Sequence, residues 1–421
     1  MAISASGVWE VRTTGSDSYG GVFDTGVTGY GTDYTQQNAP ILALTDVVTT
    51  SASATVTSVT GGFTSAMIGN GFNIAGTMYV ITAVASTTSV TVDRAVTTGA
   101  TAQVGNVGGA CASPGYVSGQ YTATIGNIIW IKAGTYNITS ATPGISGGTF
   151  NQITLSADII GYNVTRGDSP LPTSGNQPDL VVSAGINTTI LEPGTSGTIN
   201  FIKIDGTLAT TGTAIYINFG NCVSISFCES ILPSTNTGIN IYGFSMGCYA
   251  HGGGGIGFKN TSTWSVAQGI TSTNAIGFSS QASHCIAVGC YYGFEGQSDS
   301  CIAYNGNYGF ANAHCINCYA EGCTLKGFSS SEKGSPLINC ASFNTTNAWV
   351  GPMVNFQTLT VSGVVNAAGN NFAPASSGKL VNTAFSTLFG LSTSVSMDIG
   401  VFTLSGTGGV RGPLDHGPVR P

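Results

Sequence analysis

The sequence is poor in charge. Only 7 % of its 421 residues are Asp, Glu, Lys or Arg, far below the ~25 % of an ordinary soluble protein. The net charge is −7, and the eleven basic residues form no basic run of the kind that holds phosphate groups. This scarcity argues against a charge-driven nucleic-acid partner, and we expect none.

The usual residues of helix surfaces are also scarce, because Glu and Lys belong to this small charged fraction. Gly stands at 61 residues, and Gly, Thr, Ser, Asn and Val all disfavour the helix. Hydrophobic residues still make up 42 % of the chain, which is enough to bury a core and argues against disorder. Thr, Val, Ile, Tyr and Phe interrupted by Gly and Asn are typical of strands and turns. The composition therefore predicts an all-β protein.

Long apolar runs and an export signal are missing too. No uninterrupted apolar stretch approaches the ~18 residues of a membrane-spanning helix, so we expect no membrane partner. The first nine residues lack the positive charge and apolar core of a secretory signal, and we expect a protein that leaves the cytoplasm only by lysis. In that setting the eleven cysteines are expected to be free, buried thiols rather than a disulfide framework.

A Gly-Phe pair recurs in the second half of the chain. Successive pairs lie between 14 (243 to 257) and 20 (257 to 277) residues apart and begin at Gly243, Gly257, Gly277, Gly293, Gly309 and Gly327. A Cys-Ile pair runs in phase with three of them, at Cys285, Cys301 and Cys315. A variable period of this length indicates a coil of short parallel strands, whose equivalent residues stack in columns about 4.8 Å apart.

This repeat predicts a right-handed parallel β-helix with a Phe column and a Cys column inside. The Gly before each Phe is expected at a corner of the coil, where a Cβ would clash. Cys315 is assigned to the Cys column, and Cys318 is expected around the next corner.

The repeat also divides the chain into four parts. Residues 1–44 are expected to form an N-terminal segment and the first turns of the coil. Residues 45–108 contain short alternating strands without the Gly-Phe period, which predicts a small inserted antiparallel β module. Residues 109–350 form the β-helix itself. Residues 351–421 lose the repeat and are expected to hold closing strands, with an irregular extended arm over 408–421.

Several segments resemble a known family. Residues 129–138 read IWIKAGTYNI, an apolar strand followed by a Gly-Thr-Tyr turn, and residues 8–21, 159–168 and 398–400 carry further motifs. Together they resemble the pectin-lyase-like β-helix proteins in the virions of tailed bacteriophages. The resemblance implies a right-handed β-helix, and it implies that three chains lie together as a homotrimer.

Polysaccharide cleavage is an activity that this fold often carries, and glycoside hydrolysis needs two carboxylates ~5–10 Å apart. Residues 243–344 hold only four acids, Glu295, Asp299, Glu321 and Glu332. Counted from the Cys column, Glu295, Asp299 and Glu321 fall at different positions around the coil. Asp205 with Glu229 is a second, weaker candidate pair. We expect solvated turn residues here and no enzyme activity.

One segment has the spacing of metal ligands. It contains His314, Cys315, Cys318 and Cys323, but a Cys-x-x-Cys pair indicates zinc only when a second pair lies at a suitable distance. Because Cys315 is assigned to the Cys column, it is expected to point inward rather than toward a metal. The sequence therefore predicts no metal and no cofactor.

Three functions remain open. The first is a capsid decoration or cement protein, which would contact the major capsid protein of a phage. The second is a tailspike or tail fibre that binds host surface polysaccharide, with or without cleaving it. The third is a polysaccharide lyase, hydrolase or adhesin of a cell, which the missing export signal disfavours. The expectation is a non-catalytic, homotrimeric capsid decoration protein on the virion surface, made in the host cytoplasm and released by lysis.

Overall fold

The computed structural model describes residues 7–23, 38–120, 127–138, 157–172, 174–184, 197–208, 215–218, 224–232, 238–311, 314–329, 336–338, 340–347, 349, 352–354, 356–359, 364–366 and 371–374. The chain divides into two compact units. Unit 1 is Met1–Pro170, Asn176–Val181 and Thr189–Ile202, and unit 2 is Leu171–Gly175, Val182–Thr188 and Lys203–Pro421. Glu332 and the arm expected over 408–421 lie outside the described residues.

Unit 1 begins with a sheet of parallel strands that are distant in sequence. Its strands are β1 (Val8–Val11), β9 (Asn127–Lys132), β11 (Ala157–Tyr162) and β13 (Thr198–Asn200), with β2 (Val22–Phe23) antiparallel to β1 at the edge. The register stacks four fully buried residues, Trp9, Ile129, Ile159 and Ile199. In a second sheet β10 (Gly134–Ile138) lies beside β12 (Pro178–Val182).

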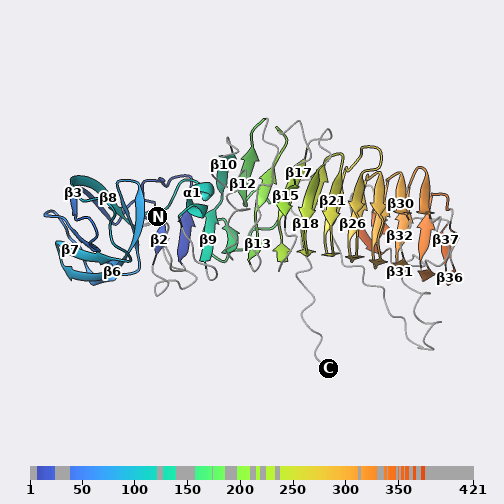
Figure 1. The fold of residues 1–421 in the computed structure, drawn as a ribbon. Coiled ribbons are helices and arrows are strands. Elements are labelled where there is room, and N and C mark those ends of the chain that lie inside the picture. The colour runs from blue at the N-terminus through green and yellow to red at the C-terminus, as the bar shows by residue number, and fades with distance from the viewer. Residues whose placement is uncertain are drawn as a thin grey trace, which may run out of the picture. The chain divides into compact units, whose positions relative to one another are not determined.

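A closed antiparallel barrel is inserted between β2 and β9 (Figure 1). It consists of β3 (Leu42–Thr49), β4 (Thr55–Thr57), β5 (Gly71–Ile74), β6 (Thr77–Ser86), β7 (Ser89–Val92) and β8 (Ala100–Val107), with a short 3-10 helix, η3 (Ser65–Met67). The barrel has its own core, which includes the fully buried Val47, Phe72 and Ile81. Its first and last strands pair at Leu42 and Val107. The inserted antiparallel module is thereby confirmed, and one helix, α1 (Pro114–Ser118), follows it.

Unit 2 is a coil whose successive turns each contribute strands to three parallel sheets. The first sheet contains β16 (Ser224–Ser226), β19 (Ser245–Met246), β22 (Ser262–Thr263), β25 (Ala282–Ser283), β28 (Ser298–Asp299), β31 (Cys315–Ile316), β34 (Leu337–Ile338) and β36 (Met353–Val354). The second contains β14 (Lys203–Asp205), β17 (Glu229–Leu232), β20 (Tyr249–Gly252), β23 (Val266–Gln268), β26 (Ile286–Val288), β29 (Ile302–Tyr304), β32 (Tyr319–Glu321), β35 (Ala341–Phe343) and β37 (Gln357–Leu359).

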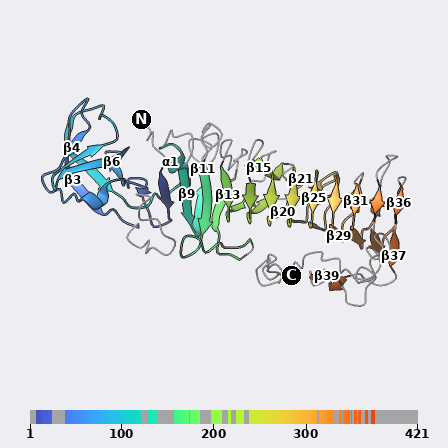
Figure 2. The ribbon, with the colours of Figure 1, turned by 90° about the horizontal axis from the view of Figure 1, so that it is seen from below.

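The third sheet contains β15 (Ile215–Asn218), β18 (Ile239–Tyr242), β21 (Ile256–Lys259), β24 (Ile276–Phe278), β27 (Tyr292–Phe294), β30 (Tyr308–Ala311) and β33 (Lys326–Ser329). An antiparallel pair, β38 (Val364–Asn366) and β39 (Asn371–Pro374), follows the coil in sequence. The strands of unit 2 follow one another turn by turn in both views (Figure 2). The predicted parallel β-helix is confirmed.

The corners of the coil depend on left-handed backbone. The residue between the first and second sheets has a positive φ in six successive turns, at Phe227, Gly247, Trp264, His284, Ser300 and Asn317. A positive φ also occurs at the end of six successive strands of the second sheet, β20 to β35, at Gly252, Gly269, Gly289, Asn305, Gly322 and Asn344. Gly and Asn tolerate this conformation best, which explains part of the Gly content.

The Gly of the Gly-Phe pair has a different role from the predicted one. It lies inside the strands of the third sheet rather than at a corner. A Cβ on Gly293 would come within 2.5 Å of the Gly309 carbonyl oxygen and within 3.3 Å and 3.4 Å of the Cβ atoms of Ala287 and Ala303. Gly is therefore required mainly because a Cβ would collide with the backbone of the next strand in the same sheet, and the Ala column of the second sheet tightens the space further.

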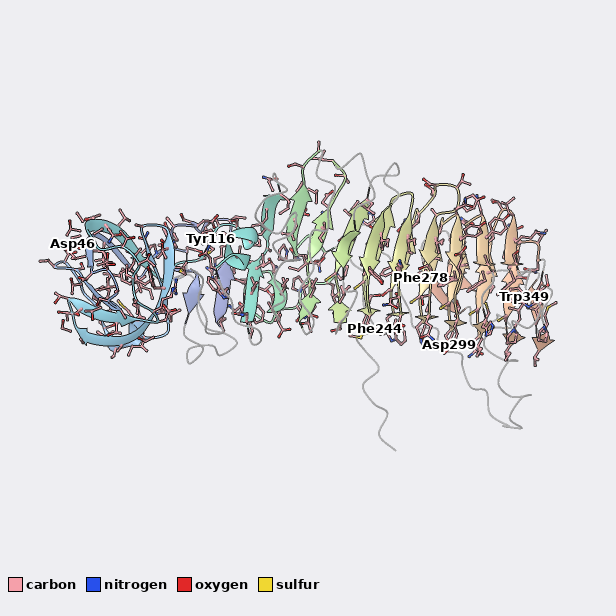
Figure 3. The ribbon with its side chains drawn as sticks, viewed as in Figure 1. Asp46, Tyr116, Phe244, Phe278, Asp299 and Trp349 are labelled. Carbon is pink, nitrogen blue, oxygen red and sulfur yellow. The ribbon has the colours of Figure 1, made fainter. Side chains whose placement is uncertain are left out.

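The Phe column is confirmed. Successive rings stack 4.8 to 4.9 Å apart and are at most 1 % exposed, at Phe258, Phe278, Phe294, Phe310 and Phe328. Phe244 was expected in this column and is not in it. The register pairs Ile241 with Phe258, which leaves Phe244 outside the strand and 53 % exposed (Figure 3).

The Cys column is also present, and it contains the predicted Cys285 and Cys301 but not Cys315. One buried position lies at the corner between the first and second sheets in seven successive turns, and the strand registers of both sheets give the same alignment. The residues at this position are Cys228, Cys248, Ser265, Cys285, Cys301, Cys318 and Cys340. The assignment of Cys315 to this column was wrong, because Cys315 aligns with Ser298, three residues before the corner. The residue around the corner, Cys318, is the true member. We call these seven residues the thiol column.

Candidate functional site

The three acids of the regular region occupy three different sheets of unit 2. Glu295 directly follows β27 in the third sheet, Asp299 lies in β28 of the first sheet, and Glu321 lies in β32 of the second. Asp299 accepts a hydrogen bond from the Ser300 hydroxyl at 3.1 Å, and Glu321 accepts one from the Tyr319 hydroxyl at 2.7 Å. The three acids therefore lie at different places around the coil, and Asp299 and Glu321 accept hydrogen bonds from different donors.

The residues with metal-ligand spacing are likewise spread over several places in the coil. His314 is exposed just before β31, whereas Cys315, Cys318 and Cys323 are buried. Cys318 lies at the corner before the second sheet, and Cys323 lies beyond that sheet. Within the part of the chain that the structure describes, no group of three or more His, Cys, Asp or Glu could hold a metal ion.

The second candidate pair, Asp205 and Glu229, lies on neighbouring strands. Lys203 of β14 pairs with Glu229 of β17, and Asp205 pairs with Ile231. Ile204, between Lys203 and Asp205, is fully buried, so the two charged side chains share the outer face of the sheet. Asp205 and Glu229 are therefore diagonal neighbours, a relation that places Cβ atoms ~7–8 Å apart.

This face continues into the next turns with aromatic and polar groups. The Glu229 carboxylate lies 3.1 Å from Nε2 of His251. The His251 ring stacks on Tyr249 at 4.7 Å, and the Tyr249 hydroxyl donates to Oε1 of Gln268 at 2.5 Å. We call Lys203, Asp205, Glu229, Tyr249 and His251 the outer-face cluster. Sequence reading missed Tyr249 and His251 because only the strand register aligns them with Glu229.

The electrostatics of the outer-face cluster favour an ionised Asp205 carboxylate. Burial alone would raise the pKa of Asp205, but hydrogen bonds from Thr207 and the charge of Lys203, 3.6 Å away, lower it overall. A general acid for glycoside hydrolysis needs a carboxyl with a raised pKa. The Asp205 carboxyl is thus suited to accepting hydrogen bonds rather than to donating a proton.

A second group of aromatic and acidic side chains lies on the third sheet. Tyr292 and Tyr308 occupy equivalent positions in adjacent turns, and their rings stack at 4.8 Å. Tyr291 meets Tyr292 edge to face at 4.9 Å. All three are partly exposed. Burial raises the pKa of the Glu295 carboxyl. Burial also raises the pKa of Tyr292, and the charges of Tyr291, Tyr308 and Glu295 add to that shift. We call Tyr291, Tyr292, Tyr308 and Glu295 the tyrosine cluster.

Comparisons with known proteins identify no relative. No family model, no curated protein and no solved structure matches the chain. Within the described ranges, no helix is both long and apolar enough to cross a membrane.

Proposed function

We propose that the protein is a non-catalytic structural component of a tailed-phage particle, a homotrimeric capsid decoration protein on the virion surface. Its partners are the major capsid protein and two further copies of itself. The observation that carries the proposal is the separation of Glu295, Asp299 and Glu321 into three sheets. In the remaining candidate pair, the lowered pKa of Asp205 means that this carboxyl is not the proton donor.

The side chains of the third sheet give a physical reason to expect a trimer. One row of positions in the third sheet carries uncharged, partly exposed side chains over five turns, at Ile239, Ile256, Ile276, Tyr292 and Tyr308, before Lys326 continues the row. Low charge lets identical faces approach without repulsion. Light scattering at micromolar concentration should give three times the chain mass, and a monomer would refute the trimer.

Two experiments separate decoration from catalysis. Purified protein incubated with host surface polysaccharide should release no oligosaccharide, and clear depolymerisation would contradict the proposal. Particles made without the protein should assemble and infect but lose resistance to heat or osmotic shock. Particles that stay stable and no longer adsorb to cells would instead make the protein a receptor-binding spike.

A tailspike or tail fibre that binds host polysaccharide is the second candidate, and the tyrosine cluster favours it. Aromatic rings on a rigid sheet beside a carboxylate offer apolar contact and hydrogen bonding together. If this function holds, Tyr292→Ala with Tyr308→Ala should weaken polysaccharide binding at least about tenfold. Ile256→Ala, in the same row of the third sheet, is the matched control and should leave binding unchanged. Equal effects of the two variants, or no binding by the wild type, would count against this candidate.

A further inference from the structure

We propose that the thiol column is a binding site for soft, two-coordinate metal cations such as Ag⁺ and Cu⁺. Each ion would be held between the sulfur atoms of two successive turns. The site needs only two ligands per ion, so it differs from the sites of three or more ligands that are missing from the described residues.

The thiols of the column share one conformation. Each sulfur donates to the carbonyl oxygen two residues earlier in its own turn, over 3.2 to 3.5 Å, at Cys228, Cys248, Cys285, Cys301, Cys318 and Cys340. From Cys248 onward, each also lies 3.4 to 3.5 Å from a carbonyl oxygen of the preceding cysteine- or serine-bearing turn. Equal conformations on in-register strands make the sulfur spacing follow the strand spacing.

That spacing suits a linear S–metal–S unit. Adjacent parallel strands lie ~4.8 Å apart, and two metal–sulfur bonds of ~2.3 Å each span about the same distance. Thiolate sulfur prefers soft ions of this kind. The runs of consecutive thiols are Cys228 with Cys248, and Cys285 through Cys340, separated by Ser265.

The charge balance also permits binding in this buried column. All ten described cysteines are buried, and none of them forms a disulfide bond. A monovalent cation that replaces one thiol proton forms one metal–thiolate bond and accepts a lone pair from the neighbouring thiol. One proton leaves to solvent for each ion bound, so the net charge of the core does not change. An ion with no such exchange would bury an uncompensated charge, which is unfavourable.

Two other cysteines provide a matched control inside the same coil. Cys290 and Cys323 occupy the corner after the second sheet, and the register places Gly306 between them. They are buried like the column thiols but lie two turns apart, too far to share one ion. Ser265 shows that Ser is accommodated in the column, because its hydroxyl donates to the Thr263 carbonyl oxygen at 3.0 Å as the thiols do.

The test uses the full chain in chloride-free buffer. Reduced protein is incubated with excess Ag⁺, passed through a desalting column, and assayed for bound silver, released protons and melting temperature. The wild type should retain about three ions, one in the two-thiol run and two in the four-thiol run, with one proton released per ion. Its melting temperature should rise, because the ions bind the folded state.

Two double variants make the result specific. Cys301→Ser with Cys318→Ser breaks the four-thiol run and should lose two of the three ions. Cys290→Ser with Cys323→Ser should retain all three. Equal losses in the two variants would overturn the proposal. A melting temperature that falls with Ag⁺ would also overturn it, since thiols would then bind silver only after unfolding.

Discussion

Among the residues that the structure describes, the most fully buried acid is Glu10, which is 0 % exposed in β1 of unit 1. Its carboxylate accepts hydrogen bonds from Nε of Arg12 at 2.7 Å, from Nε of Arg166 at 2.9 Å and from the hydroxyl of Tyr162. Arg12 and Arg166 are themselves buried. The group joins residues that lie 156 positions apart in sequence, so a single carboxylate holds together two distant segments of unit 1.

Replacing this carboxylate should be costly. Glu10→Gln removes a charge that pairs with two buried guanidinium groups, and removal of one partner of a buried ion pair costs ~3–5 kcal/mol. Chemical denaturation should show this loss. Glu295→Gln is the control, with an expected change below about 0.5 kcal/mol. Similar effects of the two substitutions would mean that the Glu10 group contributes little to stability.

Glu295 should instead affect how the stability of the folded chain depends on pH. Burial raises the pKa of its carboxyl above the ordinary 4.5, so the folded chain binds the proton more tightly than the unfolded chain. The stability from this group is complete below pH 4.5 and is lost as the pH rises through the folded-state pKa. Glu295→Gln should therefore match the wild type in melting temperature at pH 4 and slightly exceed it at pH 7. A less stable variant at pH 7 would contradict this sign.

The thiol column makes a separate prediction about Cys301. An aspartate there buries a carboxylate without a partner and should cost at least about 3 kcal/mol. A serine should cost only about 1 kcal/mol, because Ser265 already satisfies its hydroxyl in the same column. Urea denaturation of Cys301→Ser and Cys301→Asp measures the difference. Two neutral substitutions would mean that position 301 is not buried.

At the scale of the elements, the sequence predicts the coil well and its register less well. Both register errors came from steps of 14 residues, 243 to 257 for the Gly-Phe pair and 301 to 315 for the Cys pair. The aligned positions show that one turn takes at least 16 residues, as from Cys285 to Cys301, so these steps were too short. Local pairs of letters recur by chance, whereas register is fixed by strand pairing across the whole turn.

The candidate sites also depend on strand register, which spacing in the sequence does not reveal. The outer-face cluster draws Asp205, Glu229 and His251 from three successive strands of one sheet. Asp205 and Glu229 were found by their charge, but their diagonal relation depends on the pairing of Lys203 with Glu229. No spacing in the sequence reveals that pairing, because the connections between turns differ in length.

The inserted barrel should be dispensable for the rest of unit 1. Leu42 and Val107 pair directly, so deletion of Ala43 through Asn106 with a two-residue Asn-Gly link leaves a hairpin of ordinary geometry. The shortened chain should be soluble and rich in strand by circular dichroism, with cooperative unfolding. Loss of soluble expression would argue that the barrel is needed to form β1 and β9. Some destabilisation is expected, because the Asn106 amide donates to the Ser18 carbonyl oxygen outside the barrel.

At the scale of the whole molecule, the low charge governs how the protein would attach to a particle. With eleven basic and 18 acidic residues in 421, contacts must rely mainly on hydrogen bonds and apolar surface. Such contacts are screened little by salt, unlike those between exposed charges. Attachment to the capsid should therefore survive moderate salt, whereas a charge-steered complex would dissociate.

The copy number in purified phage particles tests the central claim most directly. Quantitative mass spectrometry can measure this chain against the major capsid protein of the same particles. A decoration protein must cover many equivalent capsid positions, so we expect hundreds of copies per particle, in a multiple of three. A few tens of copies or fewer would place the protein in the tail and contradict capsid decoration.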